Sequence, residues 1–188
     1  MTTQITRIES LYEGRSKFLL ATVRLPGGET VRREIEDHGP AVCVLPYDGE
    51  RRTAVLVRQF RASVFHAAGQ EANLEAIAGI VETDDPAACG RREAMEEAGL
   101  RLDAMEHVGT VWTMPGVSTE RMYLYLAPYG PAGRLGPGGG LASEHEHTAP
   151  IEMALAELAA MADAARLDDM KTALLVQTLR LRQPRLFA

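Results

Sequence analysis

The most constraining part of the sequence is residues 74–100, which read LEAIAGIVETDDPAACGRREAMEEAGL. Its second half predicts a helix with well-defined ends. Asp84 and Asp85 are candidate N-terminal caps, because a short side-chain oxygen can accept hydrogen bonds from the first free amides of a helix. Pro86 suits the first turn, and Gly99 readily adopts the left-handed conformation that ends many helices. The sequence therefore predicts a short strand, a loop and a capped helix in this order.

Three carboxylates crowd one turn of this helix. Glu93 and Glu97 are four residues apart and share a face, and Glu96 lies on its flank. Like charges at this spacing repel, so the arrangement is unfavourable unless cations neutralise it. A hard divalent cation is one candidate, because it prefers oxygen ligands. The other is the preceding pair Arg91 and Arg92, since a solvated helix face with internal ion pairs would show a similar pattern.

The residues around the carboxylates match a known motif. Residues 92–100 resemble the RE-U-x-EE-x-G-U half of the Nudix box, in which U is a large apolar residue, and Gly79 occupies the position where that box begins. Twelve residues separate Gly79 from Arg92, one fewer than usual, and Asp84 and Asp85 replace a Gly-Glu pair. This shortened loop resembles the branch of Nudix hydrolases that cleaves GDP-mannose.

The resemblance extends over nearly the whole chain and is weakest at both termini. Outside the box, the matching segments are Val57–Arg61, Met114–Gly116 followed by Thr119 and Glu120, Gly138–Gly140, and Asp168–Thr172.

The resemblance implies a set of metal ligands and catalytic residues. Mg²⁺, with Mn²⁺ as an alternative, is expected to be bound by Glu93, Glu97, Glu144 and the carbonyl oxygen of Ala78. Glu144 is also implied to activate the attacking water, and Arg92 to orient the carboxylates. The expected catalytic residues are therefore Arg92, Glu97 and Glu144. The neighbouring His145 and His147 fit either a transition-metal site or a solvated loop.

The resemblance also implies substrate-binding residues, for each of which the residue chemistry alone allows a simpler role. Arg58 and Arg61 follow a predicted strand, where a guanidinium can bind phosphate, stack on a base or pair with a carboxylate, and we assign Arg61 to the substrate. Glu120 could otherwise be an exposed loop acid, and Lys171 a surface lysine at a helix start. The expected substrate-binding residues are Arg32, Arg33, Glu34, Arg61, Glu120 and Lys171, the first three contributed by a partner subunit of a homodimer.

Composition excludes several classes of protein. The 188 residues carry a net charge of −6 and a pI near 5.4, which argues against a sequence-independent nucleic-acid binder. The N-terminal residues MTTQITRIES lack signal-peptide features, and no apolar run is long enough for a membrane span, so we expect a cytoplasmic protein. Cys43 and Cys89 show no regular spacing and are expected to be reduced and buried.

Periodicity and turn residues predict the remaining elements. Two hairpins are expected, at 17–25 with 29–35 and at 41–45 with 53–60, followed by strands at 105–112 and 121–127. Helices are expected at 151–166 and 168–181, and the glycine- and proline-rich segment 130–140 is expected to be a mobile loop.

These elements, with the resemblance, predict an α/β protein with the Nudix fold. This fold is an α-β-α sandwich with a mixed sheet, here preceded by a small N-terminal antiparallel sheet. We expect residues 1–38 to form a dimerisation region and residues 39–188 the Nudix hydrolase domain.

The expected activity is magnesium-dependent hydrolysis of a nucleoside diphosphate sugar, GDP-mannose giving GMP and mannose 1-phosphate. ADP-ribose or another nucleotide sugar remains an alternative substrate, because the box selects the diphosphate while the base-binding residues lie elsewhere. A non-catalytic module that binds nucleotide sugars is an alternative of another class, suggested by the shortened box loop.

Overall fold

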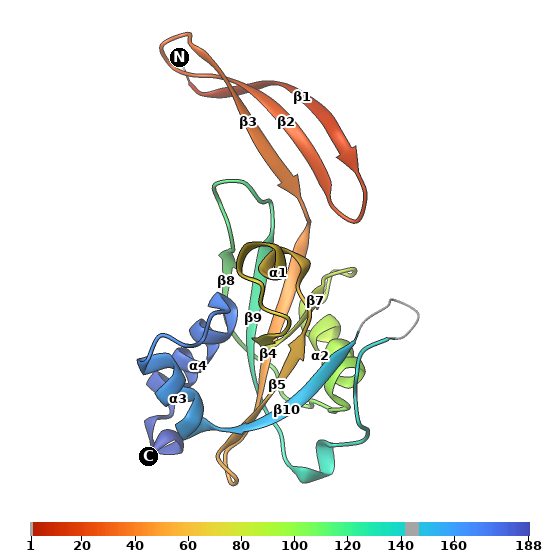
Figure 1. Ribbon diagram of the computed structural model, residues 1–188, viewed down its shortest axis with the longest axis vertical. Coiled ribbons are helices and arrows are strands. Elements are labelled where there is room, and N and C mark those ends of the chain that lie inside the picture. The colour runs from red at the N-terminus through yellow and green to blue at the C-terminus, as the bar shows by residue number, and fades with distance from the viewer. Residues whose placement is uncertain (1, 142–146) are drawn as a thin grey trace. The chain divides into compact units, whose positions relative to one another are not determined.

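The computed structural model describes residues 2–141 and 147–188 (Figure 1). The chain divides into two compact units. One comprises Met1–Ala41 with Thr110–Met122, and the other comprises Val42–Gly109 with Tyr123–Ala188. None of the helices in the described part of the chain has the length and apolar character required to cross a membrane.

The first unit contains a three-stranded antiparallel sheet. Its strands are β1 (Gln4–Glu13), β2 (Lys17–Arg24) and β3 (Thr30–Asp37), in the order β1-β2-β3. The predicted hairpin at 17–35 is therefore confirmed. The sheet leaves large apolar side chains accessible to solvent, namely Ile5, Ile8, Leu11, Tyr12 and Phe18, each at least 46% exposed.

A second, seven-stranded sheet has the order β10-β5-β4-β9-β8, with β6 paired to β5 and β7 paired to β4. The predicted hairpin at 41–60 and the strands at 105–112 and 121–127 are confirmed. The strands are β4 (Pro40–Asp48), β5 (Thr53–Gln59), β6 (Asn73–Glu75), β7 (Ile77–Ile80), β8 (Glu106–Trp112), β9 (Arg121–Pro128) and β10 (Thr148–Ala154).

Both faces of this sheet are buried. Alternate residues of a strand point to opposite faces, so Val55 and Val57 of β5 join one side of the core, where they pack with α2 (Pro86–Ala98). The intervening Leu56 is also fully buried. Helices α3 (Leu155–Asp163) and α4 (Met170–Arg182) lie on the side of the sheet away from α2 (Figure 1). Leu155 and Leu158 of α3 and Leu175 and Leu179 of α4 have no exposed surface. The α-β-α sandwich is confirmed.

Helix α2 has the predicted ends. The Asp85 side chain accepts hydrogen bonds from the amides of Ala87 and Ala88, at 3.0 and 3.1 Å, and Pro86 occupies the first turn. Gly99 ends the helix with φ of 63°. The C-terminal helix expected at 168–181 is also confirmed, since Asp169 caps α4 through the Thr172 amide.

The predicted helix at 151–166 is wrong in its first part. Residues Thr148–Ala154 form β10, which pairs antiparallel with β5, and the helix α3 begins only at Leu155. The apolar spacing of Ile151 and Leu155 fits a helix, but pairing with β5 supplies backbone hydrogen bonds that a local pattern cannot reveal. Pro150 is tolerated within β10 because this strand lies at the edge of the sheet.

The sequence also missed the short helix α1 (Ala62–Ala68), which buries none of its residues and has no side-chain cap. The segment 130–140 differs from the expected mobile loop, because it is bonded to the C-terminal end of α2. The amides of Leu135 and Gly139 donate to the carbonyl oxygens of Gly99 and Glu97 at 2.8 and 2.9 Å. The loop thereby satisfies carbonyl groups that the end of a helix leaves without intrahelical partners.

Replacement of Gly99 by alanine is expected to destabilise the protein more than replacement of Gly69. Both glycines have left-handed φ values, 63° and 68°, so either alanine costs about 1–2 kcal/mol. An added Cβ at Gly99 would also lie 2.1 Å from the carbonyl oxygen of Gly136, whereas at Gly69 it would meet nothing within 4 Å. Urea unfolding should therefore show an additional loss of about 1–3 kcal/mol for Gly99→Ala. Equal losses for the two variants would contradict this account of the loop.

Candidate active site

The strand β7 and the helix α2 place two carboxylates in a protected position. Glu93 and Glu97 are only 7% and 2% exposed, on the face of α2 that packs against the sheet. Gly79 in β7 leaves the space for Glu93, because a Cβ at Gly79 would lie 2.0 Å from the Glu93 Oε1 atom. Ala78, the predicted carbonyl ligand, precedes Gly79 in the same strand.

Arg92 binds two of the three carboxylates on α2. Its Nη2 donates to Glu93 Oε1 and its Nη1 to Glu96 Oε2, both at 2.8 Å. Partial burial lowers the pKa of Arg92, but the charges of Glu93, Glu96 and Glu82 outweigh this effect and raise it. Arg92 therefore remains a cation that restrains the directions of these side chains.

The side chains at this position fit a hard divalent cation better than a softer metal. Glu93 and Glu97 offer only oxygen atoms, and Mg²⁺ commonly takes one or two carboxylates and completes its octahedron with waters and substrate oxygens. Within residues 2–141 and 147–188, no group of three or more His, Cys, Asp or Glu side chains is arranged to hold a metal. Glu144 and His145 lie outside the described residues, and His147 is exposed.

A second charged group centres on Glu75, whose side chain is 2% exposed. Arg61 donates two hydrogen bonds of 2.8 Å to the Glu75 carboxylate, from Arg61 Nε to Oε1 and from Arg61 Nη2 to Oε2. The Lys171 ammonium lies 2.6 Å from Glu75 Oε2 and 2.8 Å from Asp169 Oδ1. Asn73 also donates to Glu75 Oε1, at 3.1 Å. This network joins the start of α1, the strand β6 and the first turn of α4.

The pKa values show that this network is charged. Burial raises the pKa of Glu75. The hydrogen bonds from Arg61 and the charges of Lys171 and Arg61 have the larger, opposite effect, and the resulting pKa is about 2. The hydrogen bond to Glu75 raises the pKa of Arg61, burial lowers it, and the charges of Glu75, Glu97 and Asp169 raise it again. Arg61 thus lies within the electrostatic influence of Glu97, although its direct partner is Glu75.

Four of the predicted substrate-binding residues belong to the first compact unit. Arg32 donates to Glu9 at 3.0 Å and Arg33 to the carbonyl oxygen of Arg32 at 2.9 Å, and Glu34 is exposed in β3. Glu120 lies 3.6 Å from the Nδ1 atom of His38.

The other predicted residues that the structure describes lie in the second unit, where they belong to two groups. One group contains Ala78, Arg92, Glu93 and Glu97, and the other contains Arg61 and Lys171. The sequence did not predict that Glu75 joins Arg61 to Lys171. A usable signal was present, since Glu75 is a single acid between the apolar residues Leu74 and Ala76. A charge inside a buried strand requires a partner, and the sequence does not show which cations supply it.

A mixed sheet between helices, with two buried carboxylates on the helix that follows a strand and a loop, defines a class of hydrolases that act on phosphate anhydrides with a bound cation. The NUDIX domain family matches residues 37–174. This match covers most of the chain, and the protein belongs to the Nudix family.

Curated relatives and a solved structure are also similar to this chain. A GDP-mannose pyrophosphatase of Cronobacter sakazakii is 40% identical over 158 residues, which are 82% of this chain and 82% of the relative. A GDP-mannose pyrophosphatase of Citrobacter koseri is 31% identical over 186 residues, 95% of this chain and 96% of the relative. The crystal structure of an ADP compounds hydrolase has the same fold, with a TM-score of 0.77, 14% identity, and coverage of 98% of this chain and 96% of that chain.

Replacement of Glu75 by glutamine is expected to destabilise the protein by roughly 3–5 kcal/mol near pH 7, because Arg61 and Lys171 lose their shared anion. The folded-state pKa of Glu75, about 2, is below its ordinary value of 4.5, so its carboxylate stabilises the fold fully above pH 4.5. This contribution is lost as the pH falls toward 2.

Urea unfolding at several pH values should therefore show a difference between wild type and Glu75→Gln that shrinks on acidification from about pH 6 to about pH 3. Glu71→Gln changes an exposed acid and should behave as wild type. A constant difference across this range would show that the charge of Glu75 is not what stabilises the network.

Replacement of Gly79 by alanine is expected to weaken cation binding while preserving the fold. The added Cβ would occupy the position of the Glu93 carboxylate, which must turn away, and a displaced ligand costs about tenfold or more in metal affinity. Calorimetric titration with Mn²⁺ measures this directly. Gly109→Ala is the matched control, because a Cβ in that strand would meet nothing within 4 Å. Unchanged Mn²⁺ affinity in Gly79→Ala would separate Glu93 from the cation site.

Proposed function

We propose that this protein hydrolyses the diphosphate bond of a nucleoside diphosphate sugar in a magnesium-dependent reaction, with GDP-mannose as the preferred substrate. The expected products are GMP and mannose 1-phosphate. The observation that carries the proposal is the pair Glu93 and Glu97, buried on one face of α2 beside Gly79. Relatives named GDP-mannose pyrophosphatase, at 30–40% identity over most of the chain, support the choice of substrate.

The proposed cation ligands are Glu93, Glu97, Glu144 and the carbonyl oxygen of Ala78. Bound Mg²⁺, or Mn²⁺ in its place, supplies neutralisation of the diphosphate charge and acidification of a water. Glu93 and Glu97 are suited to this role because their helix and Gly79 hold them in a protected, preorganised position. Arg92 positions Glu93 directly and also binds Glu96.

The proposed general base is Glu144, which would accept a proton from the attacking water. Arg61 and Lys171 are the proposed contacts to substrate phosphate. Both are cations already oriented by Glu75, so little side-chain entropy remains to be lost when phosphate oxygens bind.

We further propose a homodimer in which Arg32, Arg33 and Glu34 of one subunit, with Glu120, complete substrate recognition. The support for association is the apolar surface of the N-terminal sheet, where Ile8, Leu11 and Tyr12 are 55–60% exposed. Exposed apolar side chains of this size favour protein contacts. The buried free thiols of Cys43 and Cys89 agree with a reducing, cytoplasmic location.

The first experiment measures release of phosphate monoester from GDP-mannose, ADP-ribose and UDP-glucose, each with Mg²⁺ and with a chelator. Chelator-sensitive turnover with GDP-mannose ahead of the other two is the expected result. If ADP-ribose or UDP-glucose leads, the diphosphate chemistry stands and the choice of substrate is wrong. Binding of a nucleotide sugar without turnover would instead support a non-catalytic module.

Glu97→Gln tests the catalytic assignment. The amide loses the charge of a cation ligand, so kcat should fall by roughly 100-fold or more while the unfolding midpoint stays close to that of wild type. Glu157→Gln, which changes an exposed acid on α3, is the matched control and should retain full activity. Near-normal kcat in Glu97→Gln at saturating Mg²⁺ would remove Glu97 from the cation site.

A further inference from the structure

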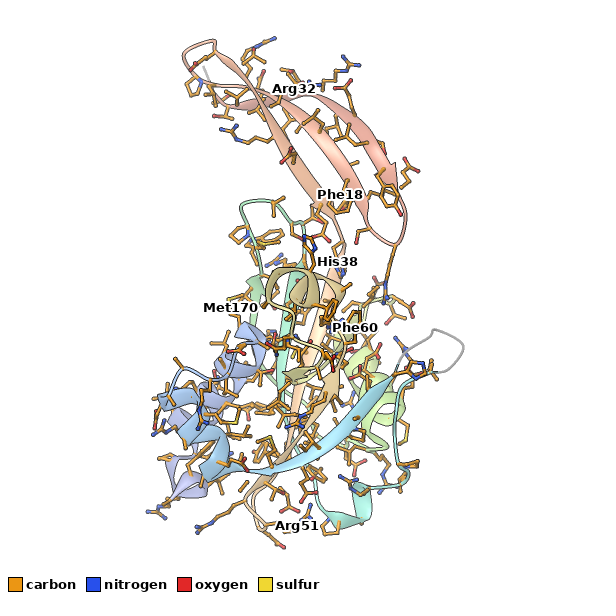
Figure 2. All side chains as sticks on the ribbon, in the orientation of Figure 1. Phe18, Arg32, His38, Arg51, Phe60 and Met170 are labelled. Carbon is orange, nitrogen blue, oxygen red and sulfur yellow. The ribbon has the colours of Figure 1, made fainter. Side chains whose placement is uncertain are left out.

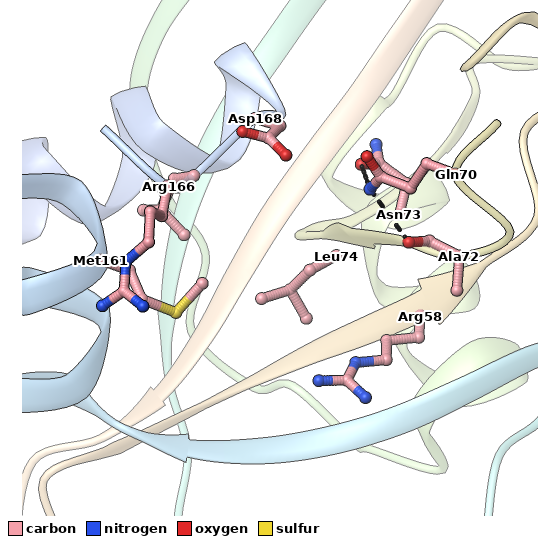
Figure 3. A pocket seen from close by; sticks show the side chains of 9 residues that line it. Arg58, Gln70, Ala72, Asn73, Leu74, Met161, Arg166 and Asp168 are labelled. Atoms are coloured by element: carbon pink, nitrogen blue, oxygen red, sulfur yellow. Dashed lines mark hydrogen bonds between the residues drawn. The ribbon is translucent and has the colours of Figure 1, made fainter. Parts of the chain in front are cut away.

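A pocket of about 260 Å³ lies between the strands β5 and β6 and the connection from α3 to α4 (Figure 3). Cations, an anion and apolar side chains line it together, among them Arg58, Leu74, Met161, Arg166 and Asp168. This combination differs from the carboxylate-lined site on α2 and has no place in the proposed reaction.

The pocket and the carboxylates of α2 lie on opposite faces of the sheet. Val57 packs with Cys89 and Ala94 of α2 in the core, and the next residue, Arg58, points to the other face because side chains alternate along a strand. Arg58 is paired with Leu74 in the β5–β6 register, so both side chains face α3 and α4. The side-chain view agrees, since Met161 and Arg166 border the same space (Figure 3).

Two guanidinium groups of this pocket are available to a ligand. Among the described residues, Arg58 and Arg166 have neither a hydrogen bond nor an ion pair with a protein side chain, in contrast to Arg61 and Arg92. Figure 3 shows the guanidinium groups of Arg166 and Arg58 at different edges of the pocket, with the Leu74 side chain between them in this view. Each guanidinium group provides several N–H donors that match the oxygens of a phosphate.

The backbone before Arg166 is strained. Ala165 has φ of 52°, a left-handed conformation that costs an alanine about 1–2 kcal/mol. The strain belongs to the tight end of α3, where the Arg166 amide donates to the carbonyl oxygen of Met161 at 2.8 Å. This turn directs Arg166 into the pocket, and strained residues of this kind concentrate at binding sites.

The other end of the pocket accepts hydrogen bonds. Figure 3 shows Asp168 and Gln70 away from the two guanidinium groups. The Gln70 amide nitrogen donates to Ala72 and Asn73, at 3.0 and 3.2 Å, which leaves its carbonyl oxygen as an acceptor. Acceptors of this kind suit hydroxyl groups, and the negative charge of Asp168 disfavours a second anionic group there.

We propose that this pocket binds a small phosphate monoester that carries hydroxyl groups, a sugar phosphate in chemical class, at a site separate from the catalytic carboxylates. Arg58 and Arg166 bind the phosphate, Asp168 and Gln70 accept hydrogen bonds from the hydroxyls, and Leu74 and Met161 contact the apolar face of the ring. The volume of about 260 Å³ is below the usual range of roughly 300–1,000 Å³ for larger ligands, which favours a ligand smaller than a whole nucleotide sugar.

Isothermal titration calorimetry with glucose 6-phosphate, in the presence of a chelator, tests this proposal independently of turnover. We expect one site, and Arg58→Gln and Arg166→Gln should each weaken binding about tenfold or more, the effect of one charged hydrogen bond. Arg185→Gln removes an exposed arginine elsewhere and should leave binding unchanged. Asp168→Asn should weaken binding of glucose 6-phosphate but not of inorganic phosphate.

Three results would overturn the proposal. The first is no detectable binding, or binding that Arg58→Gln and Arg166→Gln leave unaltered. The second is loss of binding in Glu97→Gln, which would place the ligand at the catalytic carboxylates. The third is equal affinity for inorganic phosphate or for glucose, which would show that one half of the pocket contributes nothing. Thermal unfolding of each variant confirms that the exposed substitutions leave the fold intact.

Discussion

The requirement that buried carboxylates be neutralised governs the second unit of this protein. Glu75, Glu93 and Glu97 are each less than 10% exposed, and a buried anion is stable only with a cation or strong donors beside it. For Glu75 the cations are Arg61 and Lys171, which come from the start of α1 and the first turn of α4. The same electrostatic requirement therefore holds separate parts of the chain in fixed positions.

On α2 the requirement is met in a different way. Arg92 is partly buried and donates hydrogen bonds to both Glu93 and Glu96. The face of α2 that carries Glu93 and Glu97 packs against β7. Gly79 leaves the space that the Glu93 carboxylate occupies, and we propose that the cation binds at this carboxylate. The glycine-rich segment after β9 supports the helix from its other end, through amides that bind the carbonyl oxygens of Glu97 and Gly99.

The two faces of the sheet thus carry different side chains, since α2 covers one face and α3 and α4 cover the other (Figure 1), while Figure 2 draws all described side chains. The α2 face carries the carboxylates, and the face covered by α3 and α4 carries the arginine-lined pocket. Alternation along β5 is the physical reason, because Val57 and Arg58 are adjacent in sequence and must point in opposite directions. The strand β5 therefore contributes Val57 to the core beside α2 and Arg58 to the pocket on the other face.

The sequence by itself determined the helix α2, its C-cap Gly99, an N-cap at Asp84 or Asp85, and the shared face of Glu93 and Glu97, because these depend on local chemistry and on helical spacing. Only the tertiary structure decided that Thr148–Ala154 is a strand, since its hydrogen-bonding partner β5 is distant in the sequence. It also decided that Glu75 is the anion shared by Arg61 and Lys171, which are separated from it by 14 and 96 positions. Local patterns specify elements and faces, whereas the pairing of strands and of buried charges depends on contacts between distant parts of the chain.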